Sequence, residues 1–333
     1  MEDISEVTPF KILSIDGGGI KGLYSAKILE HLEEKYGVIS DYFDMICGTS
    51  TGGLIAIALA LKIPTSEISS LYENRGQVIF PKRNKWKGII RQILWKGKYS
   101  DIPLREVLKE LFGDKKIGDV NNLLCIPSYS VTDDRPWVFK YDHTEGELER
   151  DNKTYCVDVA LATSAAPTYF PICEIDYYDS KQFIDGGVWA NNPAMVGVIE
   201  AIKRFVGFGK KFTSIEILSI SSLNYSGGKP VGLKRERSFF DWRNDLFDVS
   251  LVGQSHFTDY IMKTLCEMNE IDIYYQRIPS EDVSAEQRHL VQLDCADSNA
   301  IRFIMGKGND RGLVAKKDPL IGRFFNELKR YKI

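Results

Sequence analysis

Two short apolar segments of this chain each lead into a cluster of glycines and then into a helical pattern. The first is Lys11–Ile15, followed by DGGG at 16–19, and the second is Tyr42–Cys47, followed by GTSTGG at 48–53. Apolar residues recur at helix spacing after each cluster, so both units predict a strand, a tight turn and a helix. Repetition of this order favours an α/β fold with a mostly parallel central sheet and helices on both faces.

The length of the chain, 333 residues, is enough for one large domain or two modest ones. We expect a single domain over residues 1–333, with a core over about 8–222. The C-terminal region at 223–333 is expected to pack on that core, where it could regulate activity. Residues 75–100 interrupt the alternation of strands and helices and are predicted to be an insertion.

Composition excludes several classes of protein. The net charge is −3 and 44% of the residues are hydrophobic, so the overall balance predicts no nucleic acid polymer as a partner. The six cysteines show no CxxC spacing and no Cys/His cluster, which predicts neither a metal site nor a disulfide framework. The N-terminus has no apolar segment, and the longest apolar run, Leu54–Leu61, is too short to span a membrane. We therefore expect a cytoplasmic protein, and no cofactor is implied.

Ser50 stands in the second turn, between Gly48 and Gly52 in a GxSxG pattern. A sharp turn from strand to helix pushes its central side chain out of the fold, and the helix that follows directs free N–H groups at the same point. Both effects suit a nucleophilic serine. The same sequence also suits a serine that only caps the helix, so the motif alone leaves both interpretations open.

The first turn contains Gly17, Gly18 and Gly19, whose consecutive backbone N–H groups can form a concave site for an anion. A nucleotide-binding loop is one interpretation, but the segment matches neither GxGxxG nor GxxxxGK[ST]. An oxyanion hole beside Ser50 fits the sequence better.

Two residues are candidates for the general base. A Ser-His-Asp arrangement would need a histidine in a late loop, which leaves His289, although its surroundings look like an ordinary polar segment. Asp185 ends a short apolar segment and precedes two glycines, and a carboxylate there could accept the Ser50 proton directly. An aspartate before glycine is also common in turns, so a structural role stays open.

Four motifs in a fixed order resemble those of the patatin-like phospholipases. They are DGGGIKG at 16–22, GTSTGG at 48–53, ATSAAPTYFP at 162–171 and DGGVWANNP at 185–193. The resemblance covers somewhat more than half of the chain, and it implies a three-layer patatin-like fold and a lipid acyl hydrolase with a Ser-Asp dyad. The family most often has arginine where this chain has Lys21, so we assign Lys21 no role.

The same resemblance implies roles for five residues of this chain. Ser50 would be the nucleophile and Asp185 the general base. Gly17, Gly18 and Gly19 would form the oxyanion hole. A histidine would then not be needed.

Bacterial members of similar length include effectors of anti-phage defence, in which a cyclic nucleotide switches on degradation of the cell's own membrane. The resemblance therefore implies a phospholipid membrane surface as a partner, a cyclic nucleotide as an activator, and action at the inner membrane. A switched enzyme could also assemble into homo-oligomers. Two alternatives stay open: a constitutive acyl hydrolase of broad specificity, and a lipid-binding or storage protein with a vestigial site.

A basic segment inside the predicted insertion, KRNKWKGIIRQILWKGK at 82–98, contains no acidic residue. Its aliphatic residues share one helical face, which is typical of a helix lying on a membrane with anionic lipids. Candidates for contact with a membrane, or with a nucleotide, are therefore Lys82, Arg83, Trp86, Arg91 and Trp95. A solvated surface segment would explain the same pattern.

Overall fold

The computed structural model describes residues 8–81, 97–225, 228, 231–233, 235–268 and 272–333. Residues 82–96 of the basic segment predicted to contact a membrane or a nucleotide lie outside the described residues. They include Lys82, Arg83, Trp86, Arg91 and Trp95. Among the residues that the structure describes, none of the helices combines the length and the apolar character that a membrane-crossing segment needs.

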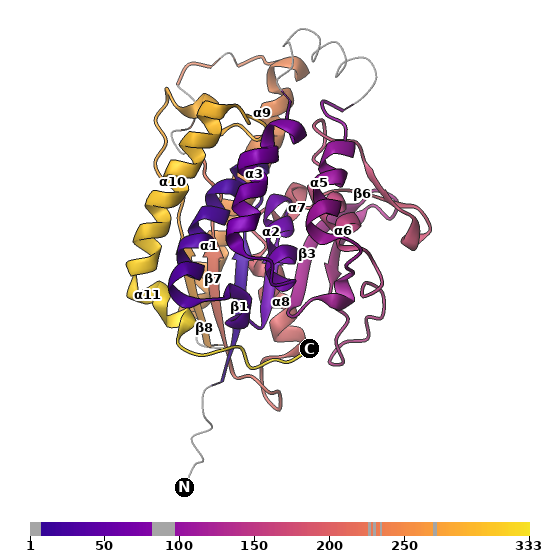
Figure 1. Cartoon of the computed structure of the whole chain (residues 1–333), viewed down its shortest axis with the longest axis vertical. Coiled ribbons are helices and arrows are strands. Elements are labelled where there is room, and N and C mark those ends of the chain that lie inside the picture. Colours follow the sequence, from indigo (N-terminus) through magenta and orange to yellow (C-terminus); the bar gives the residue numbers. More distant parts are fainter. Residues whose placement is uncertain (1–7, 82–96, 226–227, 229–230, 234, 269–271) are drawn as a thin grey trace.

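A sheet of eight strands forms the middle layer of the molecule (Figure 1). The strands are β1 (Pro9–Ile15), β2 (Met45–Gly48), β3 (Leu123–Ser130), β4 (Arg135–Lys140), β5 (Cys173–Ile175), β6 (Lys181–Asp185), β7 (Ser214–Ile220) and β8 (Asp272–Ile278). Their order is β5-β6-β3-β2-β1-β7-β8, with β4 paired to β3. The pairs that link β3, β2, β1, β7 and β8 are parallel, whereas β4, β5 and β6 join by antiparallel pairing.

Helices cover both faces of this sheet. They are α1 (Gly22–Tyr36), α2 (Thr51–Ala60), α3 (Thr65–Ile79), α5 (Ile102–Phe112), α6 (Cys156–Ser164), α7 (Gly187–Ala190), α8 (Ala194–Arg204), α9 (Phe239–Glu267), α10 (Ser298–Lys317) and α11 (Pro319–Gly322). In Figure 1, α1, α3 and α10 lie side by side on one face.

The alternation of side chains along the strands explains the three layers, because successive residues of a strand point to opposite faces. In β1, Leu13 and Ile15 join the apolar cluster that contains α1, α2 and α10. Phe10 and Ile12 join a second cluster with α8 and with Met262 of α9. The predicted three-layer α/β fold with a mostly parallel central sheet is confirmed.

Some boundaries differ from the sequence pattern. Helix α3 continues to Ile79, so the first residues of the predicted insertion at 75–100 still belong to a helix. Tyr72, Gly76 and Ile79 are buried on its inner side, which explains why the helix persists there. In the C-terminal region, β8 pairs along its whole length with β7, and α10 packs against α1.

Strand β3 brings two other strands end to end. Strand β4 pairs with β3 along residues 125–130, so it occupies one edge of β3, and β2 and β6 share the opposite edge. Strand β2 runs parallel to β3 as far as Cys125, and β6 runs antiparallel to it and ends beside Ser128. The carboxyl ends of β2 and β6 therefore point at each other across a gap of two residues of β3, 126 and 127.

Candidate active site

Ser50 sits in a sharp turn between β2 and α2. Its backbone has φ 54° and ψ −124°, a conformation that non-glycine residues rarely adopt. Both neighbouring glycines are required by close packing. A Cβ on Gly48 would lie 2.1 Å from the carbonyl oxygen of Gly52, and one on Gly52 would lie 2.3 Å from that of Ile15. The chain thus forms the strand–turn–helix arrangement that the glycine spacing predicts.

Thr163 of α6 holds this turn in place. The N–H of Ser50 donates to Thr163 Oγ1 at 3.0 Å, and the Thr163 hydroxyl donates to the carbonyl oxygen of Pro127 at 2.6 Å. Thr163 belongs to the motif ATSAAPTYFP at 162–171, and no pattern in the sequence assigns it a role. Its contact fixes a strained residue to the sheet through one buried side chain.

Asp185 is the last residue of β6, and the end-to-end arrangement of β2 and β6 brings its carboxylate to Ser50. The carboxylate accepts a hydrogen bond from the N–H of Gly187 at 2.7 Å, and the Ser50 side chain lies close to it. Burial raises the pKa of Asp185 to about 7, and the nearby Gly187 N–H and Ser50 hydroxyl oppose the rise. A carboxyl group with this pKa can both accept and return a proton near neutral pH.

The other candidate base, His289, is exposed, and its ring Nδ1 lies 2.7 Å from the carbonyl oxygen of Glu286. The described structure gives it no contact with Ser50. Of the two candidates, the fold brings Asp185 to the serine.

The glycine loop after β1 reaches the same point, but its three glycines are not equivalent. The N–H of Gly17 donates to the carbonyl oxygen of Asn191 at 3.0 Å, so it is engaged within the fold. Within the described residues, the N–H groups of Gly18 and Gly19 donate to no protein acceptor. Two of the three predicted donors are therefore available to an oxyanion, and Gly17 instead anchors the loop.

A buried network from the C-terminal region supports this loop. Arg277 of β8 donates to both carboxylate oxygens of Asp16, at 3.2 and 2.5 Å. Ser255 of α9 accepts from Asn191 Nδ2 at 2.9 Å, and its hydroxyl lies near Asp16 and lowers the pKa of that carboxyl slightly. Burial raises the pKa of Asp16, but the guanidinium of Arg277 is always charged and bonds both oxygens, which keeps Asp16 a carboxylate. No pattern in the sequence links these residues, because they lie far apart along the chain.

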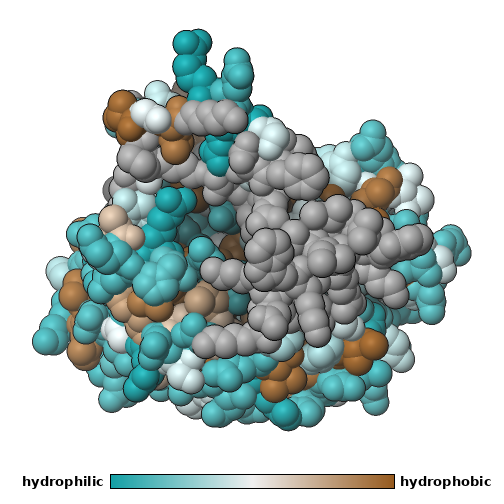
Figure 2. All heavy atoms as spheres, turned by 90° about the horizontal axis from the view of Figure 1, so that it is seen from above, coloured by the Kyte–Doolittle hydropathy of each residue, from teal (hydrophilic) through white to brown (hydrophobic). Residues whose placement is uncertain are grey.

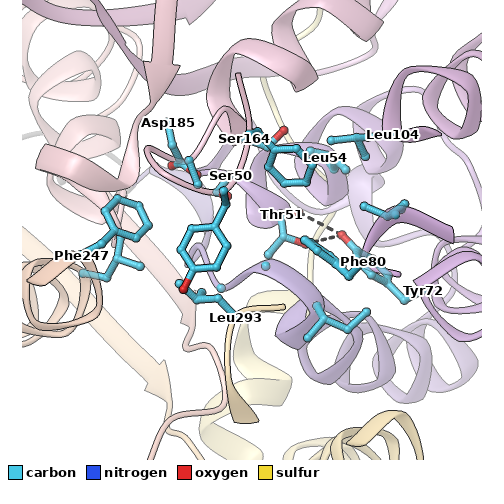
Figure 3. Close-up of a pocket in the computed structure, with 18 of the residues that line it drawn as sticks. Ser50, Thr51, Leu54, Tyr72, Phe80, Leu104, Ser164, Asp185, Phe247 and Leu293 are labelled. Carbon is cyan, nitrogen blue, oxygen red and sulfur yellow. Dashed lines mark hydrogen bonds between the residues drawn. The ribbon is translucent and has the colours of Figure 1, made fainter. Parts of the chain in front are cut away.

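A narrow apolar cavity of about 50 Å³ opens from Ser50 and Asp185. In Figure 3 Ser50 and Asp185 lie between Phe247 on one side and Tyr72 and Leu104 on the other. Its further lining comes mainly from Leu54, Leu71, Ile79, Phe80, Tyr169, Phe170, Phe247, Leu251 and Leu293. An apolar cavity with a serine in its wall suits an acyl chain whose ester carbon meets the Ser50 oxygen.

A wider cavity of about 980 Å³ lies on the other side of the glycine loop, with Gly17 and Gly18 in its wall. Figure 2 shows that this end of the molecule is hollowed. Lys21 lines it, and its ammonium group donates to Asn224 Oδ1 at 2.7 Å. Burial lowers the pKa of Lys21 to about 8, and Asp248 opposes this shift. Across the parts of the chain that are described, no three His, Cys, Asp or Glu side chains are grouped to hold a metal ion.

Replacing Gly19 with alanine is expected to reduce ester hydrolysis by about 10- to 100-fold. Removal of an oxyanion donor costs about 10²- to 10³-fold, and a donor that is only displaced costs less. Gly19 has φ +59°, and a Cβ there would lie 2.2 Å from the carbonyl oxygen of Leu293, so the loop must shift. Gly113→Ala is the matched control, because Gly113 has φ +54° with no atom within 4 Å of its Cβ position. The control should lose about 1 kcal/mol of stability and keep its activity. Equal activities of the two variants would contradict the role of the loop.

The chain is similar to several known proteins. A family model described as patatin-like phospholipase matches residues 13–198. A protein of Pseudomonas aeruginosa named cGAMP-activated phospholipase is 33% identical over 321 residues, covering 96% of this chain and 92% of that protein. One of the same name from Escherichia coli is 33% identical, covering 100% and 98%. Patatin-like protein 1 of Oryza sativa subsp. indica is 33% identical, covering 89% and 80%.

Proposed function

Because this chain belongs to the patatin-like phospholipase family, we propose that Ser50 and Asp185 form the catalytic dyad of a phospholipid acyl hydrolase. The observation that carries the proposal is that the strained Ser50 places its side chain beside a buried carboxylate whose pKa is raised to about 7. The narrow cavity beside the dyad is lined by apolar side chains and would hold the acyl chain.

In the first step, Asp185 accepts the hydroxyl proton of Ser50 as the serine oxygen attacks the ester carbon. The N–H groups of Gly18 and Gly19 face the negative charge that develops on the carbonyl oxygen. Asp185 then gives its proton to the leaving alcohol oxygen, and the lysophospholipid departs. The acyl group is left as an ester on Ser50.

In the second step, water attacks the acyl carbon while Asp185 accepts one of its protons. The bond between the acyl carbon and the Ser50 oxygen breaks, and Ser50 recovers its proton from Asp185. The fatty acid is released and the dyad returns to its starting state. Both steps need Asp185 to be ionised at the start.

We also propose that a cyclic nucleotide activates the enzyme, because relatives that align over almost the whole chain are named cGAMP-activated phospholipases. The substrate lies in a membrane, so the protein would work from the cytoplasm at the inner membrane surface, and assembly into homo-oligomers on activation belongs to the same proposal. The constitutive acyl hydrolase is the alternative.

Purified protein incubated with phospholipid vesicles, with and without cGAMP, tests the proposal. We expect fatty-acid release that depends on cGAMP. Equal release without the nucleotide would overturn the activation and leave a constitutive hydrolase. Vesicle binding without release in either condition would favour the lipid-binding protein with a vestigial site.

A further inference from the structure

Asn191, which follows α7, carries a side-chain oxygen without a partner beside the proposed dyad. The residue is 3% exposed, and its Oδ1 is buried with no hydrogen bond from any described group. Asn191 lines both the narrow and the wide cavity. An unpaired buried acceptor costs about 1–3 kcal/mol, so its retention here calls for a role.

The orientation of the amide is fixed by its neighbours. Asp16 is held as a carboxylate by Arg277, so it can only accept, and the neighbouring Ser255 hydroxyl can direct its single proton there. Ser255 Oγ can then only accept from the next residue, which requires Asn191 to present Nδ2 to it, as observed at 2.9 Å. The opposite atom, Oδ1, therefore points away from Ser255 and lies beside Gly17 and Gly187.

Oδ1 of Asn191 and Oδ1 of Asp185 face one small volume. They lie 3.3 and 3.0 Å from the point where a Cβ on Gly187 would stand. A methyl group of Leu251 of α9 lies 2.5 Å from that point. A methyl group and a water molecule are similar in size, so a water that took the place of this Leu251 methyl group would stand close to both acceptors.

The chemistry of the substrate limits what Asn191 can bind. A diacyl phospholipid ester offers only acceptor oxygens near the reacting carbon, and an acceptor cannot bond to another acceptor. Water has two protons, one for Asp185 and one for a second acceptor, which leaves its lone pair free to face the acyl carbon. Asn191 Oδ1 matches the second acceptor.

We propose that Asn191 is a positioning residue for the hydrolytic water of the second step, holding one proton of that water while Asp185 removes the other. This inference rests on the proposed function, because it requires an acyl group on Ser50. The first step does not use the water, so Asn191 acts on the second step alone.

The test follows both steps with a soluble p-nitrophenyl ester, in the presence of cGAMP. In Asn191→Ala we expect kcat to fall about 10- to 100-fold, within the range for misplaced reacting groups. We expect kcat/KM, which reports the first step, to stay within about threefold because the dyad is intact. Acyl-enzyme should accumulate and appear as a larger burst of p-nitrophenol. Equal losses in kcat and kcat/KM would overturn the proposal.

Competition between methanol and water for the acyl-enzyme gives a second test of the proposal. Methanol has one hydroxyl proton, which Asp185 takes, so it does not need Asn191. The ratio of methyl ester to fatty acid should therefore rise about 10-fold or more in Asn191→Ala. An unchanged ratio would overturn the proposal, even if total activity falls.

Two further variants complete the design. Gly187→Ala would crowd the place proposed for the nucleophile, which water and methanol share, so it should lower kcat about 10-fold or more while kcat/KM stays within about threefold, which keeps the test valid if Asn191→Ala folds poorly. Asn192→Ala is the matched control, since Asn192 is 1% exposed and its Oδ1 accepts from the N–H of Ala194. It should keep the wild-type ratio. If Ser50→Ala still forms both products, the proposed function itself fails, whereas an unchanged ratio in Asn191→Ala removes only this inference.

Discussion

Replacing Ser50 with alanine is expected to reduce fatty-acid release from phospholipid by at least about 10³-fold, as for other enzymes that lose their nucleophile. The remaining groups cannot form the acyl ester, because no other hydroxyl meets Asp185 at the end of the narrow cavity within the described residues. The fold should persist, since alanine fits the same turn and the N–H bond to Thr163 is kept. Fatty-acid release and thermal unfolding, measured on the same preparation, check both parts.

The matched control is Ser69→Ala. Ser69 is a buried serine of α3 at 2% exposure, and it lines neither cavity. Its variant should release fatty acid at close to the wild-type rate. If Ser50→Ala retained more than about a tenth of the activity, a different nucleophile would be acting, and the dyad would have to be abandoned.

Replacing Asp185 with asparagine is expected to lower kcat/KM by about 10² to 10⁴-fold, the usual contribution of a general base. Asparagine has nearly the same shape, but it cannot accept the Ser50 proton. Wild-type activity should depend on the ionised carboxylate, whose pKa is raised to about 7. The value of kcat/KM should therefore fall about tenfold per pH unit below that pKa. A soluble ester assayed from pH 5 to pH 9 gives this profile.

The raised pKa of Asp185 makes stability depend on pH in the opposite direction to activity. Burial raises the pKa of Asp185 from 3.8 to about 7, so between these values the folded state binds a proton that the unfolded state does not. The contribution of Asp185 therefore stabilises the fold as pH falls from about 7 toward 4, and it is unfavourable at higher pH. Asp185→Asn should be more stable than wild type at pH 8, by about 1–3 kcal/mol.

Urea unfolding of both proteins at pH 5 and pH 8 measures this difference. The stability gained by Asp185→Asn should be larger at pH 8, because only there is the wild-type carboxylate charged when folded. A gain that is equal at both pH values, or a kcat/KM profile that is flat down to pH 5, would contradict the assignment of Asp185 as the base.

Much of the fold is readable from the sequence because its signals are local. The glycines around Ser50 and the apolar strand before Asp16 specify two strand–turn–helix units, and the structure contains both. Ser50 and Asp185 were identified for the same reason, since each stands at the end of a strand next to glycines. The expectation that they meet came from the family resemblance, and the strand pairing of β3 supplies the physical explanation.

Other features of the site are not local and left no trace in the sequence. Ser255 and Arg277 lie more than 200 positions from the glycine loop that they support. The sequence does not distinguish Gly17 from Gly18 and Gly19, because all three are glycines in one run. Only the hydrogen bond from the Gly17 N–H to Asn191 shows that this N–H is already engaged. The covering of the dyad by Leu251 depends likewise on how α9 packs, which periodicity alone does not specify.

The position of β2 and β6 on one edge of β3 limits which changes of sequence this protein can accept during evolution. The distance between Ser50 and Asp185 is set by the number of residues of β3 from Cys125 to Ser128. One residue added or removed there would alter that distance by about 3.3 Å, more than the reach of a hydrogen bond allows. Residues 126 and 127 of β3 line neither cavity, so these positions can be substituted during evolution as far as packing permits. The number of residues in that stretch, however, is constrained by a reaction in which none of them takes part.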